Sequence, residues 1–262
     1  MPDENGDLGP EERDEEGQVS PEQEPETQQG EADEEEPVTL QPAQEGPPKP
    51  DIGEYLSEAW DVVINNAVLL ILGFFVLYVI LALASCTIIG GLIVAGPLVF
   101  GYLRVLDRRM REEPAEFGDL FGGFQDFGKA LVTYLLVFGI SLAVSIVVVL
   151  VAIVLMLIPC LGQILAVLLM IAAQVFLAAA LLFVFPVAAL SDRRPGEALK
   201  QSVAFCRANL WPTVLLALVV SLIAGAGSLV CGVGTVLTAP IAIAMVVKAY
   251  HDYYLPNAPE DV

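Results

Sequence analysis

The sequence has few of the residues that build metal sites and active sites. Its 262 residues include one histidine, His251, and four cysteines, none of them in a Cys-x-x-Cys arrangement. Zinc sites need several such ligands at short spacings, so the sequence predicts no bound metal. Nucleophile-elbow, phosphate-loop and metalloprotease motifs are also missing. We therefore expect no catalytic residues and no cofactor, and an enzyme is the least favoured class of protein.

Charged residues are equally scarce inside the long apolar runs, where they occur only near the ends. Ion-coupled pumps and proton relays carry ionisable side chains within the membrane, so this scarcity argues against a coupled pump. The net charge is -20, and we expect no nucleic-acid partner. What the chain has in excess is apolar side chains, which make up 56% of it and indicate a membrane protein.

The acidic residues are concentrated at the N-terminus. Residues 1–50 hold 17 of the 32 acids, nine prolines and only two basic residues, Arg13 and Lys49. Such a segment has too little apolar surface to offset the entropy of ordering, so we expect a disordered, cytosolic tail over residues 1–50. It lacks the basic and apolar regions of a cleaved signal, and the first membrane span is expected to direct insertion. The tail is a solubilising bristle or an arm for a protein partner, and both interpretations stay open.

Residues 51–254 are predicted to form an all-α membrane domain, followed by a short cytosolic C-terminal tail over residues 255–262. About 20 apolar residues cross the hydrocarbon core of a bilayer. Six runs of this kind occur, and the tight turns within each pair predict three helical hairpins. The runs are 66–85, 88–106, 130–157, 161–190, 210–229 and 233–249.

Basic residues set the predicted orientation. After residue 50, every Lys and Arg falls between the hairpins or next to the last run, and the three hairpin turns contain none. Because basic loops stay on the cytoplasmic side, both termini are predicted to be cytoplasmic. The expected location is the inner membrane of a bacterial cell.

An amphipathic, interfacial helix is predicted before each hairpin. The first is marked by apolar residues at helical spacing between Ile52 and Val63, the second by those between Phe117 and Leu131, and the third, more weakly, by those between Leu199 and Leu210. The first and third units also align at an offset of 143, which pairs Asn66 with Asn209 and indicates an internal duplication.

The same offset pairs Pro97 with Pro240, one in the second run and one in the sixth. A proline removes a backbone donor and favours a kink. Interrupted helices at matching places in two repeats are typical of a transporter site, whereas a kink that serves packing alone is the alternative. Both readings stay open for these two candidate kinks.

Two further groups of residues are candidates for binding or bonding. A basic cluster after the second run could hold a lipid headgroup or a partner's acidic segment, or could serve only to fix the topology. The cluster comprises Arg104, Arg108, Arg109 and Arg111. Three cysteines fall at the three hairpin turns, where a disulfide between two of them and simple packing are both open. They are Cys86, Cys160 and Cys231.

One stretch resembles a known family. It contains Phe183-Val184-Phe185-Pro186, Asp192, Pro195-Gly196-Glu197-Ala198-Leu199, Ser202 and Asn209-Leu210-Trp211, supported by Phe121-Gly122-Gly123-Phe124 and Ile158-Pro159. These residues resemble an uncharacterised prokaryotic family of six-span membrane proteins, similar to the membrane domain attached to some glycerophosphodiester phosphodiesterases. The resemblance covers residues 52–254, with Cys160 in place of an expected glycine. It implies the fold alone, because the phosphodiesterase activity belongs to a separate soluble barrel.

Two functions remain in view. The first is a noncatalytic membrane component that acts through membrane lipid or a protein partner. The second is a permease or lipid-handling protein with its site between the helices that carry Pro97 and Pro240. The sequence gives no substrate and no oligomeric state.

Overall fold

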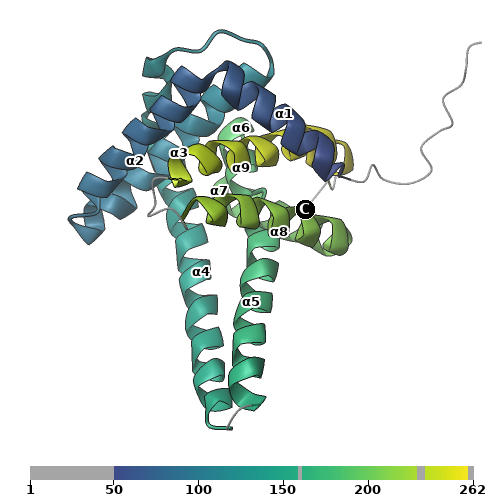
Figure 1. Cartoon of the computed structure of the whole chain (residues 1–262). Helices are drawn as coiled ribbons and strands as arrows, with labels where there is room; N and C mark the ends of the chain where they lie inside the picture. Colours follow the sequence, from purple (N-terminus) through teal and green to yellow (C-terminus); the bar gives the residue numbers. More distant parts are fainter. Residues whose placement is uncertain (1–49, 159–160, 229–233, 259–262) are drawn as a thin grey trace, which may run out of the picture. The chain divides into compact units, whose positions relative to one another are not determined.

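A computed structural model describes residues 50–158, 161–228 and 234–258. The chain divides into two compact parts, residues 1–43 and 44–262, and every described residue belongs to the part formed by residues 44–262. The predicted tail and the last four residues of the predicted C-terminal tail lie outside the described residues. Over the described part, the protein is 88% helical and contains no strand (Figure 1).

The helices follow one another with short connections. They are α1 (Ile52–Asn65), η1 (Val68–Leu72), α2 (Gly73–Ala84), α3 (Ile88–Met110), η2 (Phe117–Phe124), α4 (Phe127–Met156), α5 (Leu161–Leu181), α6 (Val184–Leu190), α7 (Pro195–Ala208), α8 (Leu210–Ser228), α9 (Thr235–Ala249), η3 (Tyr250–Tyr254) and η4 (Leu255–Asn257). The η1 and η3 segments are π-helical, whereas η2 and η4 are 3-10 helices.

The first amphipathic helix is confirmed. Asp51 begins α1 by accepting the backbone N–H groups of Gly53 and Glu54, both at 3.1 Å. Such a side-chain cap satisfies donors that the first helical turn leaves free. The buried face of α1 is formed by Tyr55, Ala59 and Val63. After Asn65 the chain turns by 86° into the run Val68–Ala84.

The duplication is also confirmed, because the element boundaries repeat at the predicted offset. Helix α7 begins and ends 143 residues after α1, and both are followed by an asparagine, Asn66 and Asn209. Each asparagine amide donates to the carbonyl four residues earlier, at 2.9 Å and 3.5 Å. The buried positions coincide too: the three buried residues of α1 correspond to Ala198, Ser202 and Cys206 of α7.

The described helices fall into three consecutive helical units: the first runs from α1 to α3, the second from η2 to α6 and the third from α7 to α9. The last element of each unit packs against the first element of another: helix α3 packs on η2, α6 on α7, and α9 on α1. Helix α3 also contacts both α6 and α9. Each of these three last elements carries a buried proline, namely Pro97, Pro186 and Pro240. The helices that carry these prolines are distant in sequence, and α3 contacts both of the others.

Close backbone contact fixes the junction between α3 and η2. A Cβ atom added to Gly123 would lie 1.9 Å from the carbonyl oxygen of Pro97, and one added to Gly101 would lie 1.8 Å from that of Leu120. No neighbouring backbone can move aside to admit a methyl group at such distances. These two glycines therefore allow the second unit to lie directly on the first.

The prediction of six spans is confirmed only in a coarser form. Among the described residues, four helices are long and apolar enough to cross a membrane: Ile89–Met110, Phe127–Met156, Leu161–Leu190 and Leu210–Ser228. A fifth is reached if α1 and Val68–Ala84 count as one bent span. Helix α9, the predicted sixth, has 15 residues. That is about 22 Å at 1.5 Å per residue, which is shorter than the roughly 30 Å hydrocarbon core.

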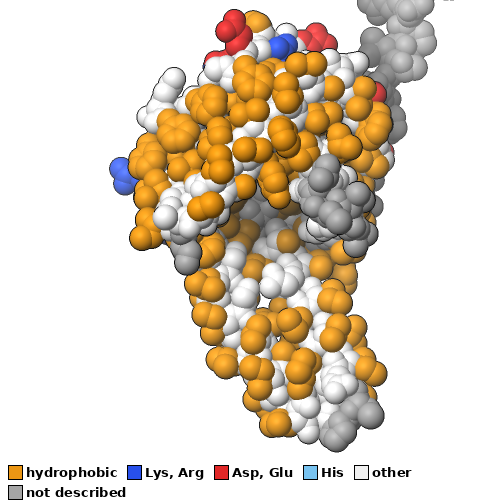
Figure 2. Space-filling view, turned by 60° about the vertical axis from the view of Figure 1, so that its left-hand side comes forward, with side chains coloured by type: hydrophobic (Ala, Val, Ile, Leu, Met, Phe, Trp, Pro, Cys, Tyr) orange, Lys and Arg blue, Asp and Glu red, His pale blue; other side chains and the backbone are white. Residues whose placement is uncertain are grey.

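Helices α4 and α5 run side by side as a hairpin that projects beyond the other helices (Figure 1). Only small residues are buried along their outer halves, notably Ala152, Gly162 and Ala166. A hydrogen bond from Gln174 to Ser145 at 3.3 Å links the two helices. Figure 2 shows apolar side chains over the visible face of the hairpin and charged ones at the opposite end of the described part. This distribution is that of a membrane protein.

Candidate functional site

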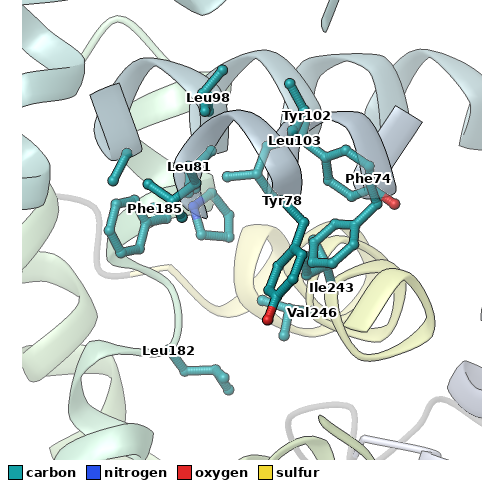
Figure 3. A pocket seen from close by; sticks show the side chains of 14 residues that line it. Phe74, Tyr78, Leu81, Leu98, Tyr102, Leu103, Leu182, Phe185, Ile243 and Val246 are labelled. Carbon is teal, nitrogen blue, oxygen red and sulfur yellow. The ribbon is translucent and has the colours of Figure 1, made fainter. Parts of the chain in front are cut away.

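An apolar pocket lies where α2, α3, α6 and α9 meet, with a volume of about 230 Å³. Figure 3 shows the side chains that line it, with Leu182, from the connection before α6, set apart from the rest. The lining residues are Phe74, Leu77, Tyr78, Leu81, Ala95, Leu98, Val99, Tyr102, Leu103, Leu182, Phe185, Pro186, Ile243 and Val246. All four helices thus contribute, and three of them are the proline-bearing elements.

Two tyrosine hydroxyls are the only polar side-chain groups in this lining. The hydroxyl of Tyr102, which is 3% exposed, donates to the backbone carbonyl of Leu70 at 3.3 Å and is already satisfied. Tyr78 is 43% exposed and stands at the surface of α2. The described residues of the lining include no carboxylate, amine, imidazole or thiol, so they would contact a ligand mainly through apolar side chains.

The two predicted kink residues flank this pocket without lining it. Pro97 and Pro240 lie inside α3 and α9, both helices continue past them, and both prolines are buried. Their neighbours do line the pocket: Leu98 on α3 and Ile243 on α9. The structure adds Pro186 on α6, which sequence analysis treated only as part of a family resemblance. A third proline within an apolar run was the signal that could have found it.

The arginine cluster is engaged with protein groups. Arg104 reaches furthest, since its Nε donates to the carbonyl of Ala189 at 3.2 Å, a second nitrogen to that of Gly122 at 3.5 Å, and a third pairs with Asp126. It therefore joins α3 to α6 and to the start of α4. The prediction of headgroup contacts remains untested, and Arg104 has a clear internal role.

The other three arginines make fewer contacts. Arg108 pairs with Asp119 at 3.2 Å, Arg111 with Asp107 at 3.3 Å, and Arg109 donates to the carbonyl of Ala115. Asp107 also contacts His251, and Lys248 pairs with Glu58 and Asp252. These contacts link the end of the third unit to the first.

Asp126 gives the Arg104 contact a pH dependence. The hydrogen bond from Arg104 lowers the pKa of this carboxyl below its ordinary value of 3.8, with the charges of Arg104 and Lys129 adding to the effect and partial desolvation opposing it. A carboxyl group whose pKa is lower in the folded protein than in the unfolded chain stabilises the fold at pH values above its unfolded-state pKa. This stabilisation is lost as the pH falls through its folded-state pKa. We expect Asp126→Asn to lower the melting temperature modestly at pH 6, and this difference from the wild type to be smaller at about pH 3, below the ordinary pKa of 3.8. An equal difference at both pH values would contradict this assignment.

Of the three cysteines predicted at hairpin turns, the structure describes only Cys86. Cys86 is exposed just after α2, whereas Cys160 and Cys231 lie outside the described residues. Both interpretations of the three cysteines therefore stay open. The fourth cysteine, Cys206, is buried in α7, and burial raises the pKa of its thiol. Among the described residues, no three His, Cys, Asp or Glu side chains come together as a metal site would require.

The fold and the pocket define a helical membrane protein with an apolar cavity between proline-bearing helices. The chain belongs to the family described as Domain of unknown function (DUF7847), whose model matches residues 124–256. The match begins at the end of η2 and continues through η3, so it includes α4 to α9. Comparisons with curated proteins and with solved structures found no match.

Proposed function

We propose that this chain is a noncatalytic membrane protein that holds the apolar chain of a membrane lipid in the pocket between α2, α3, α6 and α9. The observation that carries the proposal is the lining, which is apolar except for two hydroxyls, one of them already bonded. A polar substrate would need several convergent donors or acceptors to compensate for its lost hydration. An alkyl chain needs none.

The size of the pocket suits part of a lipid. An apolar cavity of about 150 Å³ is enough to bind benzene, so about 230 Å³ accommodates a segment of an acyl chain. Access is through the face of α2, where Tyr78 is 43% exposed and Leu81 is half-buried. A chain entering from the bilayer would meet these two side chains first, with its headgroup left outside.

The proposed membrane arrangement extends the spans that the helices support. In it, η1 with α2 forms the first crossing and α9 contributes the sixth, giving three hairpins. Both termini face the cytoplasm of a bacterial cell, on the side of the basic residues.

A pocket-filling substitution tests the proposal. Val99 is partly buried and lines the pocket, so Val99→Trp should occupy the space that the acyl chain would take. The protein is irradiated in vesicles that contain a phospholipid with a photoreactive diazirine on its acyl chain, and the labelled peptides are identified. We expect labelling of α2, α3, α6 and α9 to fall roughly ten-fold in the variant, the change that about 1.4 kcal/mol of lost affinity produces.

Leu150→Trp is the matched control, because Leu150 is 59% exposed on α4 and lines no pocket. Its labelling pattern should equal that of the wild type. Ile243→Phe is a smaller pocket-filling change, for use if Val99→Trp folds poorly. Unchanged labelling of the four helices in a folded pocket variant would show that only surrounding bilayer lipid had been captured, and would overturn the proposal.

A further inference from the structure

Helix α7 and the residues directly before it carry basic side chains that are engaged with no carboxylate of the described residues. Arg193, Lys200 and Arg207 are exposed, and none of them has an acidic group within ion-pairing distance there. Arg104, Arg108, Arg111 and Lys248 contrast with them, since each has a carboxylate partner. The three unpaired residues are called the basic stripe below.

Two members of the basic stripe, Lys200 and Arg207, lie on one face of α7, whereas Arg193 precedes the helix. Lys200 and Arg207 are seven residues apart, which is close to two helical turns, so their side chains project in nearly the same direction. The buried residues of the helix, which faces α5 and α6, are Ala198, Gln201, Ser202, Phe205 and Cys206. Lys200 and Arg207 lie on the opposite side of the helix from these residues. Glu197, nearby, accepts the backbone N–H of Arg194 at 3.1 Å and is occupied at the helix start.

The internal duplication shows that packing does not require this charge. In the first copy, the positions equivalent to Arg193, Lys200 and Arg207 are Pro50, Ser57 and Ile64. Helix α1 nevertheless has the same length and the same terminal asparagine as α7, and its three buried residues are buried in α7 as well. The basic stripe therefore belongs to something that α7 does and α1 does not.

A second feature at the end of α7 indicates a lipid–water boundary. The candidate span α8 begins at Leu210, directly after Asn209, so the stripe ends three residues before hydrocarbon-spanning helix begins. Trp211 is 78% exposed at this point. Exposed tryptophan is enriched at the level of the lipid headgroups, where its ring is apolar and its N–H remains hydrated.

The helical backbone is interrupted at Asn209, between α7 and α8, much as it is interrupted at Asn66, after α1. Asn209 has φ -123° and ψ 49°, close to the φ -116° and ψ 29° of Asn66, where the chain turns by 86°. A helix that leaves a span through such a break can lie along the membrane surface instead of extending away from it. Its exposed side chains then stay at headgroup level.

The geometry points to a binding surface for anionic phospholipid headgroups, formed by Lys200 and Arg207 on the exposed face of α7, by Arg193 directly before the helix and by Trp211 after it. The basic side chains contact lipid phosphates, and arginine in particular can donate two parallel hydrogen bonds to one phosphate. This surface is separate from the apolar pocket. It holds whether or not the pocket binds an acyl chain.

The experiment uses the tryptophans as local probes. The chain has two, so Trp60→Phe leaves Trp211 alone near the end of the stripe, and Trp211→Phe leaves Trp60 on helix α1, which carries acidic but no basic residues. The full chain is placed in neutral phosphatidylcholine nanodiscs with a small fraction of phosphatidylglycerol or phosphatidylcholine, each bearing the same fluorescent acceptor. Energy transfer from Trp211 should indicate roughly five-fold or greater enrichment of the anionic acceptor, the factor that one basic side chain near an anionic surface supplies.

Two controls make the result specific. Arg193→Gln, Lys200→Gln and Arg207→Gln combined should abolish the preference, whereas Arg108→Gln with Arg111→Gln, which removes paired charges, should preserve it. Trp60 should report no preference. Equal transfer to both acceptors in the otherwise unchanged protein, or a preference that survives loss of the stripe, would overturn the inference. If the stripe were shielded equally in nanodiscs with anionic and with neutral lipid, a protein segment would be its occupant, and the inference would also be overturned.

Discussion

Gly123→Ala is expected to destabilise the protein by roughly 3 kcal/mol or more, the upper range for overpacking a tight interior. The added methyl carbon would lie 1.9 Å from the carbonyl oxygen of Pro97 and 2.6 Å from the backbone nitrogen of Gly101. Both obstacles are backbone atoms, so relief requires α3 and η2 to separate. Separation would also displace Leu98 and Leu103, which line the pocket on the same helix.

The neighbouring residue supplies the matched control. A Cβ atom on Gly122 would meet nothing within 4 Å, so Gly122→Ala should leave stability unchanged or raise it slightly. The measurement is the thermal unfolding midpoint of both variants in the same detergent, with the amount of monodisperse protein recovered. A Gly123→Ala variant as stable as Gly122→Ala would mean that α3 and η2 do not approach as closely as described.

Arg104→Met is expected to cost about 2 to 3 kcal/mol, the range for hydrogen bonds that involve a charged group. Methionine keeps much of the apolar stem but removes the guanidinium that holds Ala189, Gly122 and Asp126. These contacts join the first unit to the second. Arg104→Lys should recover only part of the loss, since an ammonium cannot reach three partners with the geometry of a planar fork.

Arg108→Met is the comparison for this prediction. Arg108 makes one ion pair with Asp119, and both side chains are more than a third exposed. Exposed pairs contribute at most about 1 kcal/mol, so the unfolding midpoint should shift little. Equal shifts for Arg104→Met and Arg108→Met would show that the reach of Arg104 across three elements adds nothing to stability.

The contrast between these two arginines illustrates a limit of the sequence. Arg104, Arg108, Arg109 and Arg111 were predicted as one basic cluster, because composition treats neighbouring charges alike. Their partners come from elements far along the chain, up to Ala189, and depend on how α3 meets α6 and η2. Lys200 and Arg207 of α7 were not part of this predicted cluster, and among the described residues neither has a carboxylate partner.

The number of spans shows a similar limit. Hydropathy located each apolar run within a few residues, since a run of apolar side chains is a local property of the sequence. It could not distinguish a helix that crosses a bilayer from one that is apolar because the protein surrounds it. Much of α9 is buried, including Ala242, Met245 and Val247, and its apolar character serves packing as well.

The sequence by itself determined the helical class, the positions of most helices, the amphipathic face of α1 and the internal duplication. Each of these depends on periodicity or on spacing along one stretch of chain, which local geometry converts directly into structure. The tertiary structure decided which proline-bearing helices come into contact, which arginines are engaged with protein and where the pocket lies. These follow from close approach between distant segments, such as that of Gly101 and Gly123, and such contacts depend on three-dimensional complementarity that no single stretch of sequence contains.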